Sequence, residues 1–312
     1  MSKTRSCLGM PAFAVIALGL VTGCNFNRIA VDTTASVLVE AQDTTRAYFD
    51  WESGGYAAAS GIMQLEGLHA VSPDNEELSL MLAKAYMAYA YGWVMDAHDL
   101  AELRGDFVES EHHQQRAYLM YSRARDLAMR VMARRDPSFP SVVQQDPRAL
   151  RKYLEKHFHD AKRDVPPLFW LVMSWSTAVN NSPDSTEFVD MPAIRTIAEW
   201  IAKLDEGYED AGTLVFLGGF SSSYPKQVGG DPVKGKQYFE RAAQLTQRKN
   251  HILLVNYAVF YAISVQDRAL FLSLLHEVVE AGDQGPRFRL GNKVARRRAQ
   301  RYLQRVDEFF IQ

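Results

Sequence analysis

Cysteine is almost absent from this sequence, with only Cys7 and Cys24 among 312 residues. The CxxC, HExxH, GxSxG and GxGxxG motifs and a complete P-loop are absent as well. These gaps exclude a fold held together by several disulfides and a thiolate zinc site, and they remove the common nucleotide-binding and hydrolase signatures. We therefore expect no cofactor, no bound metal and no enzymatic activity.

Two histidine pairs come nearest to a metal site. His112 and His113 are adjacent, so on a helix their side chains would diverge by about 100°. His157 and His159 are two positions apart, which suits a loop beside Asp160 better than a helix. We expect both pairs to lie on the solvated surface.

The chain lacks a strong charge of either sign, since 35 basic residues face 37 acidic ones. One arginine run stands near the C-terminus, at residues 296–298, with Arg301 and Arg305 following it. We interpret it as the solvent face of the last helix, pairing with acidic residues elsewhere in the chain. The balance of charge therefore predicts no nucleic-acid partner.

Long hydrophobic runs are scarce too, and the clearest one lies at the N-terminus. Residues 8–21 (LGMPAFAVIALGLV) follow Lys3 and Arg5 and have the length of a signal-peptide core. They are too few to span a bilayer, which takes about 20 apolar residues. Small residues at 21–23 then lead into Cys24, a pattern that resembles the bacterial lipobox. We predict a signal peptide at 1–23 and acyl chains on the thiol of Cys24, which would anchor the protein to a membrane.

An ordinary secretion signal with an incidental cysteine and a short buried helix are the alternatives to this interpretation. Asn25 follows the cysteine, where aspartate is typical of lipoproteins kept in the inner membrane. We therefore expect the protein in the outer membrane, facing the periplasm. Residues 24–45 are predicted to be a lipidated tether and residues 46–312 a helical domain.

Strand-like alternation is also scarce, whereas apolar residues recur at helical spacing over most of the chain. Between residues 109 and 135 they recur at steps of three and four until Asp136-Pro137 stops the helix. Residues 290–310 show a similar apolar stripe opposite arginines. The fold is predicted to be all-α.

Several segments have the spacing of tetratricopeptide (TPR) helix pairs. EELSLMLAKAYMAYA (76–90), GTLVFLGGFSSSYP (212–225) and GKQYFERAAQL (235–245) place large, small and aromatic residues near the offsets of that repeat. The spacing between motifs departs from 34 residues, so we predict a TPR-like superhelix with degenerate repeats. A nonrepeating helical bundle is the alternative.

Four stretches in order resemble the T-component (TatT) family of TRAP transporters, the tripartite ATP-independent periplasmic systems. They are residues 65–96, 121–139, 229–245 and 292–310. The resemblance implies a TPR-like periplasmic lipoprotein that self-associates as a homotrimer and docks the solute-binding protein of such a transporter. It also implies a groove or channel able to hold a small hydrophobic ligand, and it supplies no catalytic residues.

Aromatic side chains are the candidates for the wall of that groove. On a helix, Tyr86, Tyr89 and Trp93 would share one face, and Trp170 and Trp175 lie in a second apolar segment. Tyrosine and tryptophan can combine apolar contact with a hydrogen bond. The alternative is that these rings only pack between helices.

Two functions from different classes fit these patterns. The first is a lipid-anchored transporter component that holds a solute and docks a solute-binding protein. The second is an envelope assembly or tethering scaffold that binds a peptide or a partner's helix in the same groove. A hydrolase ranks third, because acidic pairs are plentiful but nothing in the sequence selects a catalytic one.

Overall fold

A computed structural model describes residues 26–311 of the chain, and Cys24 with the predicted signal peptide lies outside them. Over the described residues the secondary structure consists of helices, with no strand. The prediction of an all-α fold is therefore confirmed.

The N-terminal half contains the longest helix of the chain, α6. Its helices are α1 (Phe26–Glu40), α2 (Gln42–Arg46), α3 (Trp51–Val71), α4 (Glu76–Tyr89), the π-helix η1 (Ala90–Val94), α5 (Met95–Leu103), α6 (Phe107–Arg135), α7 (Phe139–Val142) and α8 (Pro147–His157). Because α4, η1 and α5 follow one another without a break, they form one long helix with a π-helical turn in its middle.

The C-terminal half repeats this pattern of long helices and short connections. Its helices are α9 (Ala161–Asn181), η2 (Ser185–Asp190), α10 (Met191–Leu204), α11 (Tyr208–Ser223), η3 (Lys226–Val228), α12 (Pro232–Leu245), α13 (His251–Asn256), the π-helix η4 (Tyr257–Ala262), α14 (Arg268–Glu280), η5 (Pro286–Phe288), α15 (Arg289–Gln304) and α16 (Val306–Phe309).

Short polar side chains start most of the long helices. The carboxylate of Asp50 accepts the backbone N–H of Ser53 at the start of α3, and Asn75 does the same for Leu78 at the start of α4. Asp106, Asp160 and Asp267 cap α6, α9 and α14 in the same way. Each cap satisfies a backbone donor that the first helical turn leaves free.

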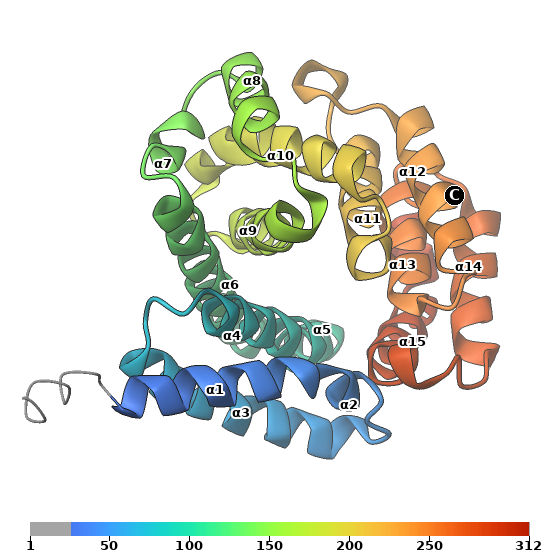
Figure 1. Cartoon of the computed structure of the whole chain (residues 1–312). Helices are drawn as coiled ribbons and strands as arrows, with labels where there is room; N and C mark the ends of the chain where they lie inside the picture. Colours follow the sequence, from blue (N-terminus) through green and yellow to red (C-terminus); the bar gives the residue numbers. More distant parts are fainter. Residues whose placement is uncertain (1–25, 312) are drawn as a thin grey trace, which may run out of the picture.

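The chain winds around helix α9, which Figure 1 shows end-on near the centre of the molecule. Each long helix packs mainly against the next long one, from α3 through α4, α6, α9, α10, α11 and α12. Helix α15 then packs on α14 and returns to α2 and α3, so the path closes on itself. Successive pairing is what a TPR-like stack requires, but the repeat itself stays a prediction.

The hydrophobic core follows this path as a row of connected clusters. One cluster joins α6, α8, α9 and α10, a second joins α11 to α15, and a third joins α3, α4 and α6. A small fourth cluster seats α1 on α3 and α4 through Val31, Ala35 and Leu78. The segment expected as a tether thus forms α1 and most of α2, and Val31 and Ala35 of α1 are buried against α3 and α4.

Candidate functional site

The predicted aromatic residues lie on two helices that both contribute to the interior of the winding path. Tyr86 and Tyr89 are on α4, Trp93 is on η1, and Trp170 and Trp175 are on α9. Four of them are half-buried, whereas Trp175 is 3% exposed and lies in the core between α9 and α10. The indole N–H of Trp175 donates to Asp190 at 3.0 Å, so its polar atom is satisfied inside the fold.

Trp93 belongs to a stack of three aromatic rings. Its ring lies 6.0 Å from those of Trp51 and Tyr89, measured between centroids, with nearly parallel planes. The indole N–H of Trp93 donates to the carbonyl of Trp51 at 2.9 Å, and that of Trp51 donates to the carbonyl of Gly92 at 3.2 Å. Arg297 of α15 covers the outer ring, with its guanidinium 3.7 Å from the centroid of Trp51. The stack therefore joins α3, η1 and α15.

Tyr86 belongs to a polar cluster between α3 and α6. Its hydroxyl donates to Glu66 at 2.8 Å, and Arg123 holds both oxygens of the same carboxylate at 2.8 Å. Burial, together with the hydrogen bond to Glu66, raises the pKa of Tyr86 to about 12. Tyr86 and Trp93 therefore both contact α3, Tyr86 through Glu66 and Trp93 through Trp51.

Trp170 borders a cluster of charges at the junction of α2, α4 and α11. The ammonium of Lys84 lies 5.4 Å from the centroid of the Trp170 ring and 3.1 Å from a carboxylate oxygen of Glu209. Glu209 also pairs with Arg46 of α2. Burial lowers the pKa of Lys84, and the neighbouring Glu209 opposes that shift. A charged amine over an indole face is a favourable arrangement at a partly desolvated site.

The start of α11 has an uncommon backbone conformation. Glu209, Asp210 and Ala211 have φ angles of 46°, 58° and 61°, in the left-handed region that non-glycine residues rarely adopt. Asp210 pairs with Arg287 at 2.6 Å and with Arg46 at 3.5 Å. These ion pairs join the left-handed turn to α2 and to η5.

A cavity of about 270 Å³ lies elsewhere, between α5, η4 and the C-terminal helices. Its walls combine the ion pairs Asp99–Arg301 and Glu102–Arg305 with apolar side chains. The apolar and aromatic lining residues are Leu103, Val259, Ile263, Tyr302 and Phe309. Its volume is near the lower end of the range for small-molecule sites.

None of the five aromatic candidates lines this cavity. The sequence did carry a signal for this cavity. Asp99 and Glu102 are three positions apart on α5, and their ion-pair partners Arg301 and Arg305 are four positions apart at the end of α15. That signal could be recognised only once the two helices were known to be neighbours.

Of the C-terminal arginines, only Arg296 lies on the exposed face that the sequence predicted. Arg297 and Arg301 both bind Asp96 of α5, and Arg301 is only 8% exposed. Arg298 stacks on Tyr91, with its guanidinium 4.0 Å from the ring centroid. Pairing with distant acidic residues therefore occurs as predicted, but it turns these side chains inward.

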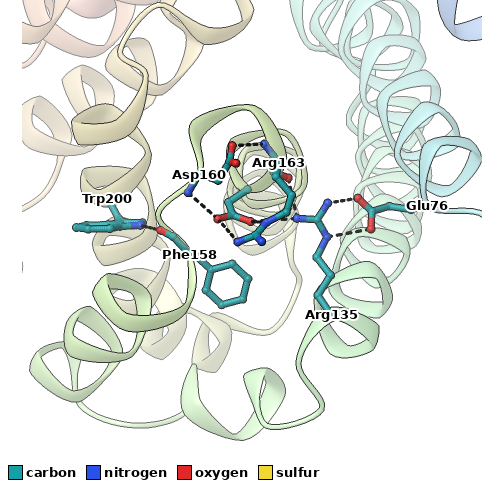
Figure 2. A network of polar contacts seen from close by, with 7 residues as sticks. Glu76, Arg135, Phe158, Asp160, Arg163 and Trp200 are labelled. Atoms are coloured by element: carbon teal, nitrogen blue, oxygen red, sulfur yellow. Dashed lines mark hydrogen bonds and ion pairs between the residues drawn. The ribbon is translucent and has the colours of Figure 1, made fainter.

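A second network of charges surrounds the buried carboxylate of Asp164 at the start of the central helix α9 (Figure 2). Arg135 of α6 binds the carboxylate of Glu76 on α4 and lies 3.4 Å from Asp164 on α9. Arg163 binds Asp164 at 2.7 Å, and the Asp164 carboxylate is 1% exposed. Because every charge in this network has a partner of opposite sign, its role is to hold α4, α6 and α9 together.

Neither metal ligation nor membrane spanning is evident over residues 26–311. In this range no three histidine, cysteine or acidic side chains come together as a metal site would require. His112 and His113 lie beside each other, with ring centroids 5.4 Å apart, and His157 lies 3.7 Å from Asp136. No helix in the same range is both long and apolar enough to cross a bilayer.

Comparison with known proteins identifies the family. The profile of the TRAP transporter T-component matches residues 50–310. The chain belongs to this family. An uncharacterized protein from Treponema pallidum (strain Nichols) is similar to it, with 23% identity over 317 residues that cover 96% of this chain and 97% of that protein. The resemblance inferred from the sequence is thus confirmed.

Family membership associates the protein with a TRAP transporter and indicates a place in the cell envelope. The T-component is a transporter component and not an enzyme family.

Proposed function

We propose that this protein is a lipid-anchored T-component that faces the periplasm, docks the solute-binding protein of a TRAP transporter and holds a small apolar ligand. The observation that carries the proposal is the family match over residues 50–310, which takes in nearly the whole helical path. The absence of the common catalytic motifs from the sequence agrees with a role in binding rather than in catalysis.

Attachment to the membrane would depend on Cys24. No helix among residues 26–311 could span a bilayer, so the acyl chains would supply the anchor. More than one chain is needed for stable attachment, and a bacterial lipoprotein carries several on one cysteine. The lipobox-like residues 21–24 and Asn25 support an anchor in the outer membrane with the domain in the periplasm.

The ligand would occupy one of two places. The first is a half-buried aromatic wall, either Trp170 beside Lys84 or the stack around Trp93. Tyr86 and Tyr89 lie on α4, the helix that carries Lys84 and continues into Trp93. The cavity between α5 and α15 offers a partly open volume of about 270 Å³ whose walls are both apolar and charged. Trp175 is a weaker candidate because its ring is buried in the core.

Docking is tested by sedimentation of the detergent-solubilised full chain with each candidate solute-binding protein of a TRAP transporter encoded nearby. We expect a heavier complex at micromolar concentrations and physiological salt, and a mass of the protein alone that corresponds to a homotrimer. Independent sedimentation with every neighbouring solute-binding protein would refute the docking role. Binding of a peptide or a partner's helix instead would favour an envelope scaffold.

Anchoring is tested by the variant Cys24→Ser. The variant should fold but leave the membrane fraction, and it should fail to incorporate labelled palmitate. The wild type is the control for expression and folding. Equal labelling of the two proteins would contradict the assignment of a lipoprotein.

A further inference from the structure

Helices α1 and α3 lie side by side along one edge of the molecule, the lower edge in Figure 1. Their solvent-exposed faces carry large apolar residues and almost no charge. Phe26, Ile29 and Val37 of α1 are 78%, 54% and 61% exposed, and Tyr56 and Met63 of α3 are 81% and 74% exposed. Together these five residues define the apolar edge.

Arg28 and Asp32 of α1 contact the connection between α3 and α4, and the other charged residue of α1, Glu40, is exposed at its C-terminal end. Between residues 26 and 39 only Arg28 and Asp32 are charged. Arg28 pairs with Asp74 at 3.0 Å, and Asp32 accepts hydrogen bonds from Ser72 at 2.6 Å and Asn75 at 2.7 Å. Apart from the amide of Asn27, the exposed side chains on the other side of α1, from Phe26 to Val37, are apolar or carry a hydroxyl.

Helix α3 repeats this arrangement. Between residues 53 and 71 it holds one acidic residue, Glu66, and no lysine or arginine. Glu66 points to α6, where Arg123 and Tyr86 bind it. Its outer stripe at steps of three and four runs through Tyr56, Ser60 and Met63 to residues 67 and 70, which are glycine and alanine.

We propose that the apolar edge rests on the surface of the lipid bilayer. The proposal depends on acylation of Cys24, which is part of the proposed function. Cys24 stands two residues before Phe26, and two residues span at most about 7 Å. Acyl chains on Cys24 would thus hold the first turn of α1 at the membrane interface.

The chemistry of the edge suits this location. Phenylalanine, isoleucine, tyrosine and methionine side chains partition into the boundary between headgroups and acyl chains. Tyrosine places an apolar ring and a polar hydroxyl at the same level of a membrane. Because the edge has no basic cluster, apolar insertion rather than attraction to anionic lipids holds it in place.

Contact along α1 and α3 would also fix the orientation of the domain. Helices α8 and α10 lie at the opposite side of the molecule from this edge (Figure 1). They would face away from the bilayer, where a periplasmic partner has access to them. The anchor would then set which surface is presented, in addition to keeping the protein at the membrane.

Single-cysteine labelling can test the proposal on the full acylated chain. After signal removal the only native cysteine is Cys24, whose thiol is acylated, so an introduced cysteine is the one reactive site. Ile29→Cys and Met63→Cys place a polarity-sensitive fluorophore on the edge. Val233→Cys is the matched control, because Val233 is 69% exposed on α12, away from α1 and α3. All three would be reconstituted on phosphatidylcholine vesicles that contain a spin-labelled lipid as quencher.

We expect the labels at positions 29 and 63 to shift to shorter emission wavelengths and to be quenched by the lipid, while the label at 233 does neither. Labels at 29 and 63 that stay as aqueous as the control, on protein that floats with the vesicles, would overturn the proposal. A shift without lipid quenching would overturn it too, because it shows that a second copy covers the edge. If the protein does not float with the vesicles at all, it is the acylation of Cys24 that fails.

Discussion

Asp96 and Arg301 are 205 residues apart in the sequence, yet a carboxylate oxygen of Asp96 accepts a hydrogen bond from Nη1 of Arg301 at 2.6 Å. Arg297 holds the other oxygen at 2.9 Å. Asp96 is 2% exposed, so one buried carboxylate joins α5 to two arginines of α15. This contact closes the helical path, because it ties the last long helix to the N-terminal half.

We expect Asp96→Ala to cause a large loss of stability, because Asp96 joins α5 to α15. The substitution leaves two arginines without their shared partner, one of them buried, and removal of one member of a buried pair costs about 3–5 kcal/mol. Chemical denaturation measures the change in the free energy of unfolding. Asp307→Ala is the control, since Asp307 pairs with Arg268 but is 78% exposed, and exposed pairs contribute about 0–1 kcal/mol. Equal losses for the two variants would show that the path does not depend on Asp96.

Helix faces were predictable from the sequence, but helix partners were not. The stripes of residues 109–135 and 290–310 correspond to α6 and α15 with α16, because apolar periodicity reports which side of a helix is buried. It does not report which helix covers that side. The arginines of α15 were therefore assigned to solvent, although Arg301 packs against α5.

The aromatic candidates show a second limit. Ideal helical phase puts Tyr86, Tyr89 and Trp93 on one face, and Tyr89 and Trp93 do stack. The π-helical turn η1 adds a residue to the repeat after Tyr89, which rotates the positions that follow it. Nothing in the local pattern predicts such a turn. The left-handed backbone at residues 209–211 could not be predicted for a similar reason, because the ion-pair partners of this turn are distant in the sequence.

Substitution of alanine for two glycines of α3 is expected to have opposite effects on stability. A Cβ atom at Gly55 would lie 2.5 Å from Nε1 of Trp93, which is fixed by its hydrogen bond to Trp51. We expect Gly55→Ala to cost about 1–3 kcal/mol through overpacking. A Cβ atom at Gly61 meets nothing within 4 Å, so Gly61→Ala should stabilise the helix by up to about 1 kcal/mol.

Thermal unfolding of both glycine variants measures these changes, and tryptophan fluorescence reports displacement of the Trp93 ring. A stabilising effect at both positions would show that the contact between α3 and η1 is looser than described. A destabilising effect at both would show that Gly61 also faces a close neighbour.

The raised pKa of Tyr86 should make the protein less stable at alkaline pH. Its pKa is raised to about 12 in the folded protein, against an ordinary value of 10 in the unfolded chain. Between these values the unfolded state loses its proton first, so the free energy of unfolding falls as the pH rises from 10 to 12. Tyr86→Phe should make this fall shallower. Tyr56→Phe is the control, because Tyr56 is 81% exposed, and it should leave the slope unchanged. The measurement is the free energy of unfolding at several pH values between 10 and 12. Identical slopes of this free energy against pH for the wild type and Tyr86→Phe would contradict the prediction.

The location of the apolar ligand can be decided by three substitutions. Trp175→Ala empties a packed core position and should cost about 3–5 kcal/mol. Trp170→Ala should cost less, because Trp170 is half-buried. Ile263→Trp would fill the cavity between α5 and α15, where Ile263 is a wall residue. Stability is followed by thermal unfolding and ligand binding by a hydrophobic fluorescent probe.

If the ligand lies against the aromatic walls, Trp170→Ala weakens probe binding with a melting temperature near that of the wild type, and Ile263→Trp leaves binding intact. If the ligand lies in the cavity, Ile263→Trp weakens probe binding, because a tryptophan at position 263 occupies the volume that the probe would fill. Trp170→Ala then leaves probe binding intact. Trp175→Ala should bind the probe normally in whatever fraction stays folded, since its ring is surrounded by core residues of α9 and α10. Probe binding that none of the three substitutions alters would place the ligand outside the cavity and away from Trp170, and would remove Trp170 from the candidate residues.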